Sequence, residues 1–186
     1  MKMGLLKKLN FLNKIKENKI KKNFEEALAA EARKDYYEAE EKFRKVIEAC
    51  PKFEEAYLGL ARILKELDKN EEAEKILQEQ LNKNPNPKIY CELSQIYVKL
   101  KNFKKAIEMS EKAISLDETL FEAYLSLGEA LENIAAQREN YGHREEALEA
   151  YKKAWKAYLK AEELRHSYFL QEKCNTIGKK VLEMKI

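Results

Sequence analysis

The chain has 186 residues, of which 45% are hydrophobic and 37% are charged. This length suits one ordinary domain or one short array of repeats, and the hydrophobic content excludes a chain that is disordered throughout. Only five glycines and three prolines are present, so the composition is rich in helix formers and predicts an all-α protein. No run of about 18 apolar residues occurs, and no transmembrane helix is expected.

The net charge of +3 conceals a basic N-terminus, because residues 1–23 carry eight lysines and one glutamate. Aliphatic residues recur among these lysines at helical spacing, namely Leu5, Leu9, Leu12 and Ile15. This pattern predicts a basic amphipathic helix over residues 1–22. Three roles remain open for it: a cap on the helices that follow, contact with an anionic membrane or a partner, or contact with nucleic acid. The lack of an interleaved aromatic stacking platform disfavours nucleic acid.

A fourfold self-similarity follows this segment. The stretches KDYYEA, DKNEEA, KNFKKA and GHREEA each end in an alanine, at Ala39, Ala73, Ala106 and Ala147, at intervals of 34, 33 and 41 residues. A second series of small residues has a similar period and comprises Ala27, Ala61, Ser94 and Gly128. Apolar residues surround the second series at helical spacing, as in YLGLARIL. Each period therefore predicts two helices joined by a short polar turn, with small residues where the helices cross closely.

Prolines and one long interval mark the boundaries of these periods. Pro51 and Pro85 stand 34 residues apart, where a second helix is expected to end. The interval of 41 exceeds 34 by seven residues, which is about two helical turns. We favour a longer hairpin, with one extra turn on each helix and a turn at residues 140–142, over a loop insertion. Helical spacing then continues through Leu170, Cys174, Ile177, Val181 and Met184, and predicts a C-terminal capping helix within residues 162–186.

These residues resemble the tetratricopeptide repeat, a helix–turn–helix unit of 34 residues. The repeats are placed at 20–53, 54–86, 87–120 and 121–161, within an array spanning 23–161. The first repeat departs from the pattern, because Asn23 and Glu26 occupy slots that should be apolar. The resemblance implies a right-handed all-α solenoid of about four repeats, between the basic N-terminal helix and the capping helix.

The resemblance also implies a function, which is non-catalytic binding of a protein or peptide by an adaptor or assembly scaffold. In this family the first helices of successive repeats line a concave groove. Carried over by position, the candidate lining residues are Glu55, Leu58, Arg62, Lys65, Lys88, Cys91, Gln95, Lys99, Glu122, Leu125 and Glu129. Glutamates at 92, 122 and 129 depart from the lysine–asparagine clamp of some members, which disfavours a C-terminal carboxylate as the ligand. The alternative is that these charges only solvate the face.

Catalysis is not expected. The sequence has no P-loop, GxGxxG, HExxH or GxSxG motif, and its two histidines and three cysteines lack metal-ligand spacing. No catalytic residue, cofactor or metal is therefore predicted. The odd number of cysteines and the lack of a CxxC motif suggest a reducing compartment, and we expect a cytoplasmic protein. The alternative function is a membrane-surface assembly factor anchored through residues 1–22.

An aromatic group near the C-terminus allows two interpretations. Its members are Tyr151, Trp155, Tyr158, Tyr168 and Phe169. Trp155 falls on the helical stripe that follows Ala147, so core packing is the first interpretation. The second is an exposed patch at the end of the array, suited to association.

Overall fold

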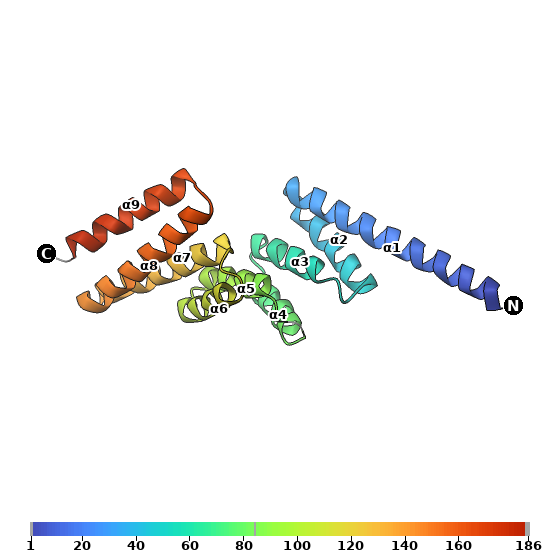
Figure 1. Cartoon of the computed structure of the whole chain (residues 1–186), viewed down its shortest axis with the longest axis horizontal. Helices are drawn as coiled ribbons and strands as arrows, with labels where there is room; N and C mark the ends of the chain where they lie inside the picture. The colour runs from blue at the N-terminus through green and yellow to red at the C-terminus, as the bar shows by residue number, and fades with distance from the viewer. Residues whose placement is uncertain (1, 84, 185–186) are drawn as a thin grey trace. The chain divides into compact units, whose positions relative to one another are not determined.

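The computed structural model describes the backbone of residues 2–83 and 85–184, with the side chains of residue 14, residues 16–83 and residues 85–184. Over these residues the chain forms nine α-helices and no strand (Figure 1). Its contacts divide it into two units, Met1–Gln80 and Leu81–Ile186, which are described separately. The helices are α1 (Lys2–Ala32), α2 (Tyr36–Ala49), α3 (Glu54–Glu66), α4 (Asn70–Leu81), α5 (Pro87–Lys99), α6 (Phe103–Leu116), α7 (Phe121–Asn140), α8 (Arg144–Leu164) and α9 (Tyr168–Glu183).

The four hairpin turns share one backbone conformation. In each turn a residue with a positive φ stands five residues before the anchor alanine, and these residues are Lys34 (62°), Asp68 (59°), Lys101 (56°) and Gly142 (78°). The next residue donates its N–H to the carbonyl five residues back, as Asn102 does to Tyr97 at 2.9 Å. This bond satisfies a carbonyl left free at the helix end. The turn is therefore rebuilt in every hairpin together with the helices.

The residue after the left-handed position also starts the next helix in two hairpins. Asp35 accepts a hydrogen bond from the backbone N–H of Glu38 at 3.2 Å, and Asn102 accepts one from Lys105 at 3.3 Å. Such N-caps satisfy donors that the first turn of a helix leaves free. Each of these turns therefore closes one helix and opens the next within three residues.

The small residues of both periodic series are buried, as predicted. Ala27, Ala61, Ser94, Ala39, Ala73, Ala106 and Ala147 are each 0% exposed, and Gly128 is also buried. At Gly128 a Cβ atom would lie 2.7 Å from Cε1 of Tyr158, which is closer than real Cβ contacts come. The Tyr158 ring of α8 therefore packs directly on the backbone of α7, and this contact fixes the crossing of the two helices.

The first repeat accommodates Glu26, one of its two polar residues at slots expected to be apolar, by an ion pair. Glu26 is half-buried and forms an ion pair with Lys42 of α2. The neighbouring Phe24 packs edge-on against Phe43 and Phe53, with ring centroids 5.9 and 4.9 Å away. The Phe24 ring therefore supplies an apolar contact between α1 and the residues that follow it in the fold. The sequence pattern had placed this apolar contact at positions 23 and 26.

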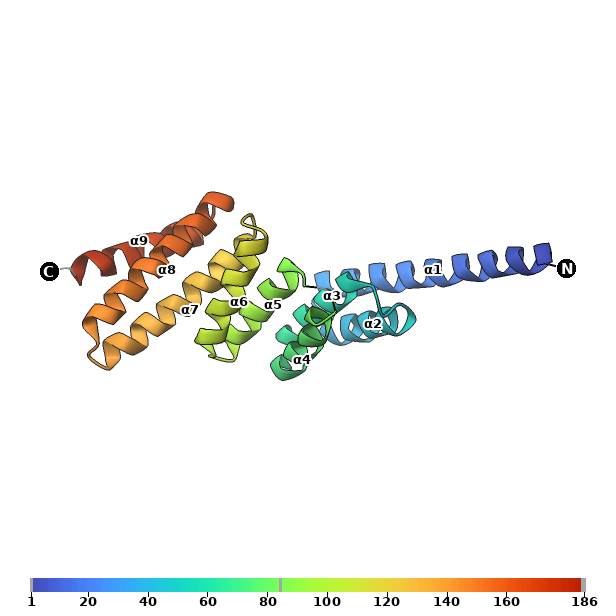
Figure 2. The ribbon, with the colours of Figure 1, turned by 60° about the horizontal axis from the view of Figure 1, so that its bottom comes forward.

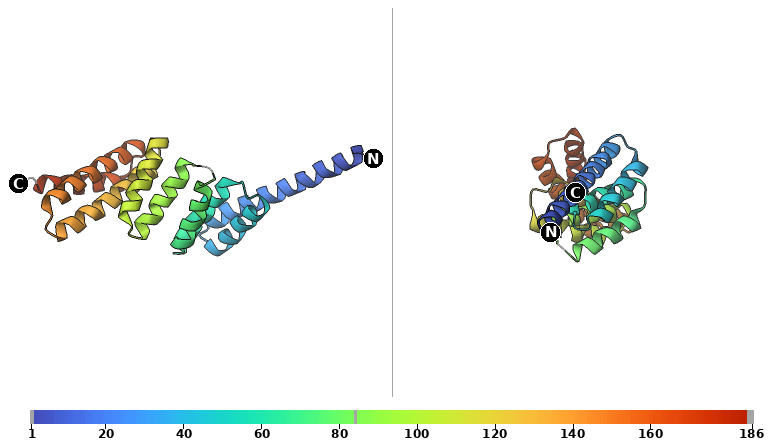
Figure 3. Two further views of the ribbon diagram at one scale, coloured as in Figure 1. Left: turned by 90° about the horizontal axis from the view of Figure 1, so that it is seen from below. Right: turned by 90° about the vertical axis from the view of Figure 1, so that its right-hand side faces the viewer.

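Helix α1 continues through the boundary placed at residue 22. It runs from Lys2 to Ala32 without a break, and its N-terminal half extends past α2 (Figure 3, left). The aliphatic stripe Leu5, Leu9, Leu12 and Ile15 lies outside the described side chains, so its role as a cap stays a prediction. Among the side chains that are described, Lys14, Lys16 and Lys19 are exposed.

The fourth hairpin is longer than the third, as predicted (Figure 2). Helix α7 has 20 residues against 13 in α5, and α8 has 21 against 14 in α6. Each helix therefore gains seven residues, so the prediction of one extra turn on each helix is wrong. The interval between Ala106 and Ala147 includes the extension of α7, whereas the extension of α8 follows Ala147 and leaves no trace in that interval.

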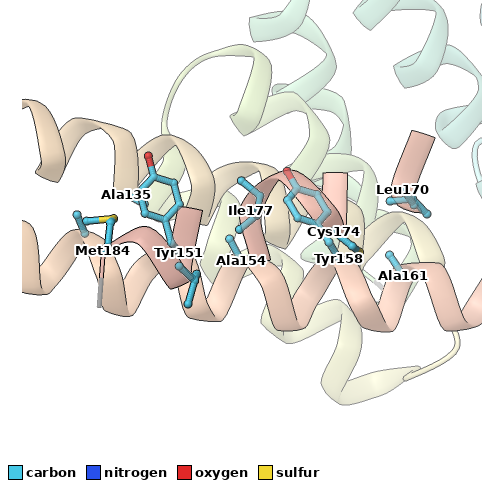
Figure 4. Close-up of a cluster of buried hydrophobic side chains, with 11 residues drawn as sticks. Ala135, Tyr151, Ala154, Tyr158, Ala161, Leu170, Cys174, Ile177 and Met184 are labelled. Atoms are coloured by element: carbon cyan, nitrogen blue, oxygen red, sulfur yellow. The ribbon is translucent and has the colours of Figure 1, made fainter. Parts of the chain in front are cut away.

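Helix α9 covers α8 at the C-terminal end of the second unit. The predicted stripe of Leu170, Cys174, Ile177, Val181 and Met184 is buried. Figure 4 shows Tyr151, Ala154, Tyr158 and Ala161 of α8 beside residues of this stripe. The aromatic group contains both core and surface residues. Tyr151 and Tyr158 are core residues and Trp155 is half-buried, which agrees with core packing. Tyr168 and Phe169 are exposed, as in the alternative of a surface patch.

We expect Gly128→Leu to lower the free energy of unfolding by at least about 1–3 kcal/mol, because the new side chain must displace the Tyr158 ring. Thermal unfolding monitored by circular dichroism measures the change. Asn133→Leu on the same helix is the control, since Asn133 is exposed and the change should stay within about 0.5 kcal/mol. An unchanged melting temperature for Gly128→Leu would contradict the close crossing.

Candidate protein-binding surface

Three helices of the second unit share one face, which we call the first-helix face and which comprises α5, α7 and α9. Helix α5 packs against α7. Two ion pairs then join α7 to α9: Lys173 Nζ lies 2.9 Å from Glu132 Oε2, and Lys180 Nζ lies 2.7 Å from Glu139 Oε1. Side chains from these three helices therefore reach a common surface.

A polar layer fixes α7, α8 and α9 beneath this face. The Tyr158 hydroxyl donates to Glu132 Oε2 at 2.6 Å, and Lys173 Nζ donates to both oxygens of Glu132 at 3.0 and 2.9 Å. The same ammonium group lies 5.8 Å from the centroid of the Tyr158 ring. One carboxylate therefore joins a residue of each neighbouring helix by hydrogen bonds to a charged group, which are the stronger kind.

A second layer repeats this arrangement seven residues along. The Tyr151 hydroxyl donates to Glu139 Oε2 at 3.0 Å, and Lys180 pairs with the other oxygen and lies 5.8 Å from the Tyr151 ring centroid. We refer to the two sets as the Glu–Tyr–Lys layers. A spacing of seven residues returns to nearly the same side of a helix, so the long fourth hairpin has room for both layers.

The pKa values of three members of the layers, Glu139, Tyr151 and Tyr158, are shifted. Burial, followed by the hydrogen bond to Glu139, raises the pKa of Tyr151 to about 12. Burial, followed by the bond to Glu132, also raises the pKa of Tyr158 well above its ordinary value. The hydrogen bond from Lys180 lowers the pKa of Glu139. In the layer of Glu139 and Tyr151 the carboxylate is therefore held charged and the phenol protonated.

The candidate lining residues of the first unit lie on α3. Leu58 and Lys65 are buried, so they offer little surface to a partner. Arg62 is half-buried, and its Nε lies 3.0 Å from Oε1 of Glu31 on α1. Glu55 is exposed. Within this unit, the structure therefore leaves Glu55 and the partly exposed Arg62 accessible.

The candidate lining residues of the second unit lie on α5 and α7. Lys88 and Lys99 are exposed, Cys91 is buried, and Gln95, Glu122, Leu125 and Glu129 are half-buried. Glu122 Oε1 lies 3.1 Å from Nη2 of Arg165. Position in the repeat therefore assigned these residues to the first helix of each hairpin, but it did not distinguish the accessible residues from the buried ones.

A pocket of about 390 Å³ opens on the first-helix face. Val98 of α5, Glu129 and Glu132 of α7, and Lys173 of α9 contribute to its lining. Burial raises the pKa of Glu129, the positive charge of Lys173 opposes this shift, and the negative charge of Glu132 adds to it. A carboxyl group with a raised pKa beside a pocket is a candidate for a functional residue.

Sequence reasoning named Glu129 but missed Glu132 and Lys173. The sequence does contain a pattern that marks these residues. Glu132 and Glu139 are seven residues apart, and so are Lys173 and Lys180. Surface charges are common on helices, so this spacing is informative only once the structure shows that the glutamates pair with the lysines.

No group of three or more His, Cys, Asp or Glu residues in the described part of the chain is arranged to hold a metal ion. No helix over the same residues is both long and apolar enough to cross a membrane.

We expect Tyr151→Phe to reduce the rate at which the free energy of unfolding falls as the pH rises above 10. The folded-state pKa of about 12 exceeds the ordinary value of 10.0, so the protonated phenol contributes its full stability below pH 10. That contribution is lost as the pH rises from 10 to about 12. Urea unfolding at pH 9 to 12 measures the slope. Tyr141→Phe, at a site that is 78% exposed, is the control and should keep the slope of the intact chain. Equal slopes for all three proteins would contradict the assigned layer.

Comparison with protein families gives two matches. A model described as tetratricopeptide repeat matches residues 27–91, and a second model with the same description matches residues 87–120. Together they span just over half of the chain and end before α7. A comparison with curated protein sequences gives no match.

Solved structures give several matches. A MamA fragment from Desulfovibrio magneticus RS-1 has a TM-score of 0.60 at 18% identity, covering 90% of this chain and 95% of that one. A thermophilic tetratricopeptide protein of Thermus thermophilus, TTC0263, has a TM-score of 0.58 at 18% identity, with coverage of 89% and 91%. The first tetratricopeptide domain of human RPAP3 has a TM-score of 0.56 at 20% identity, with coverage of 69% and 92%.

At these identities the similar structures show the fold alone, and they confirm the all-α tetratricopeptide solenoid as the fold class. Proteins of this fold generally act as non-catalytic modules that bind other proteins. The repeat period, the buried small residues, the shared turns and the family matches agree, and the chain belongs to the tetratricopeptide repeat family.

Proposed function

We propose that the chain is a non-catalytic adaptor or assembly scaffold that binds a protein or peptide on the first-helix face. The observation that carries this proposal is the pocket between α5, α7 and α9, with the half-buried Glu129 in its lining. Both Glu–Tyr–Lys layers brace α7 and α9, two of the three helices around it. A braced surface loses little conformational entropy on binding, so more of the contact energy remains as affinity.

The charges around the pocket suggest what the partner presents there. Lys173 donates its hydrogen bonds to both oxygens of Glu132, so that ammonium group is already engaged when a partner arrives. Burial disfavours the charged form of Glu129. A lysine or arginine of the partner beside Glu129 would offset that cost. We therefore assign Glu129 the role of receiving a cationic side chain.

We expect Glu129→Gln to stabilise the fold and to weaken binding. The pKa of Glu129 is raised above 4.5, so its stabilising contribution is present below pH 4.5 and is lost as the pH rises through the folded-state value. At pH 7 the variant should therefore unfold at a higher temperature than the intact chain, with a smaller difference at pH 4. Less partner should be captured from a lysate of the source organism.

The matched control is Glu149→Gln, which removes the same charge from an exposed position on α8. It should change neither stability nor capture by a measurable amount. Capture of the same protein in the same amount by Glu129→Gln and by the intact chain would contradict the assignment of the first-helix face.

The exposed lysines of α1 favour a second candidate, a membrane-surface assembly factor anchored through residues 1–22. Lys14, Lys16 and Lys19 are exposed on α1, and the N-terminal half of this helix extends past α2 (Figure 3). Lysines near an anionic surface each contribute about 1 kcal/mol of attraction. The three free cysteines are compatible with the cytoplasmic face of a membrane, or with the cytoplasm itself, where thiols stay reduced.

Co-sedimentation with phosphatidylserine vesicles tests this candidate. The full chain should sediment with these vesicles and remain in solution with neutral ones. A Lys14→Glu/Lys16→Glu/Lys19→Glu variant should lose the association, because each reversal replaces attraction with repulsion. Lys75→Glu/Lys153→Glu/Lys156→Glu changes the net charge equally at exposed positions of α4 and α8 and should still sediment. Equal recovery of the full chain with anionic and neutral vesicles would exclude the membrane role.

A further inference from the structure

The unequal lengths of the third and fourth hairpins create a step within the second unit. Helix α7 runs two turns longer than α5, and its C-terminal end extends beyond the turn between α5 and α6 (Figure 2). A pocket of about 590 Å³ lies in this step. We call it the step pocket, and its lining includes Lys101, Phe103, Lys104, Ile134, Arg138 and Tyr141.

The charged residues that line the step pocket are all positive. Lys101, Lys104 and Arg138 contribute to its lining, and among the described residues no aspartate or glutamate does. Arg138 Nη1 lies 3.3 Å from Oε2 of Glu146, outside the lining, so one of the three cations is partly engaged. Lys101 and Lys104 are both exposed. The pocket therefore attracts an anionic group.

The start of α6 adds to this attraction. The first turns of α4 and α8 carry glutamates, at 71 and 72 and at 145 and 146, whereas the first turn of α6 carries no acidic residue. Lys104 and Lys105 stand in the equivalent places. Cations near a helix N-terminus oppose the helix dipole, and an anion there would be stabilised by it. The helix dipole therefore does not stabilise Lys104, whereas it would stabilise an acidic ligand at the same place.

An apolar surface accompanies the charge. Phe103 is 9% exposed and Ile134 is half-buried, whereas Tyr141 stands 78% exposed at the end of α7. A tyrosine ring offers a large, rigid surface at a small cost in conformational entropy, which suits it to binding sites. The step pocket therefore offers an apolar seat between groups that attract carboxylates.

We propose that the step pocket binds an acidic peptide segment of a partner protein. The carboxylates of the segment approach Lys101, Lys104 and the N-terminus of α6, and one aromatic or leucine side chain packs between Ile134 and Tyr141. This site lies at the turn edge of the hairpins and is distinct from the first-helix face. It uses the stretch KNFKK, which has lysines at 104 and 105 where the second and fourth repeats have glutamates.

Selection from a display library of random 12-residue peptides against the full chain tests this proposal. Peptides that bind should be rich in aspartate and glutamate around one aromatic residue or leucine. Fluorescence polarisation with the selected peptides should show affinity reduced about tenfold or more in Lys101→Glu/Lys104→Glu. Tyr141→Ser should also weaken binding. Because Lys104→Glu places a carboxylate at a helix N-terminus, α6 should be no less stable in the double variant.

Two controls separate this site from the rest of the chain. Lys153→Glu/Lys156→Glu makes the same change in net charge on α8 and should keep full affinity. Glu129→Gln should also keep it, so failure of the first-helix proposal would not be mistaken for failure here. The proposal is overturned if the selected peptides are not acidic, if acidic peptides bind Lys101→Glu/Lys104→Glu as tightly as the intact chain, or if Glu129→Gln abolishes their binding.

Discussion

The close approach of neighbouring helices at small residues is the constraint on which this structure depends. At two glycines the helices approach so closely that an aromatic ring occupies the space that a Cβ atom would need. A Cβ at Gly59 would lie 2.4 Å from the Phe43 ring, and one at Gly128 would lie 2.7 Å from the Tyr158 ring. A methyl group has no room at either contact, because packed interiors contain few voids. The small residue and the ring are therefore one unit of packing, and the helix axes follow from it.

The seven added residues of α7 and α8 have consequences on two sides of the second unit. Inside, they lengthen the contact between α7, α8 and α9, and Glu139, Tyr151 and Lys180 form a second layer there. Outside, the lengthened α7 forms one wall of the step pocket beside the unextended α5–α6 turn. An insertion of seven residues keeps the buried side of a helix buried. It could therefore extend the surface of the protein without disturbing the packing that the repeats share.

Local features of this fold could be predicted from the sequence, and features joining distant residues could not. Small residues, turns and helical stripes repeat within each period, so the burial of Ala73 and Gly128 was predictable from the repeat pattern alone. The pairing of Glu132 with Lys173 joins residues 41 positions apart, and each alone resembles an ordinary solvated charge. The boundary at residue 22 rested on charge, which does not end a helix. In fact no proline or glycine interrupts α1 after Gly4, so its continuity was predictable from the residues that break helices.

The two proposed sites involve residues that the fold itself does not favour. Glu129 is a half-buried carboxylate whose charged form is disfavoured by burial, and Lys104 places a cation where the helix dipole favours an anion. Local choices that oppose stability are expected at functional positions, because selection there acts on binding. The two sites also have opposite charge preferences, since Glu129 suits a cation and the step pocket suits an anion. A ligand that fits one is therefore repelled by the other. Under these proposals, one rigid unit could hold two different partners, which is what an assembly scaffold requires.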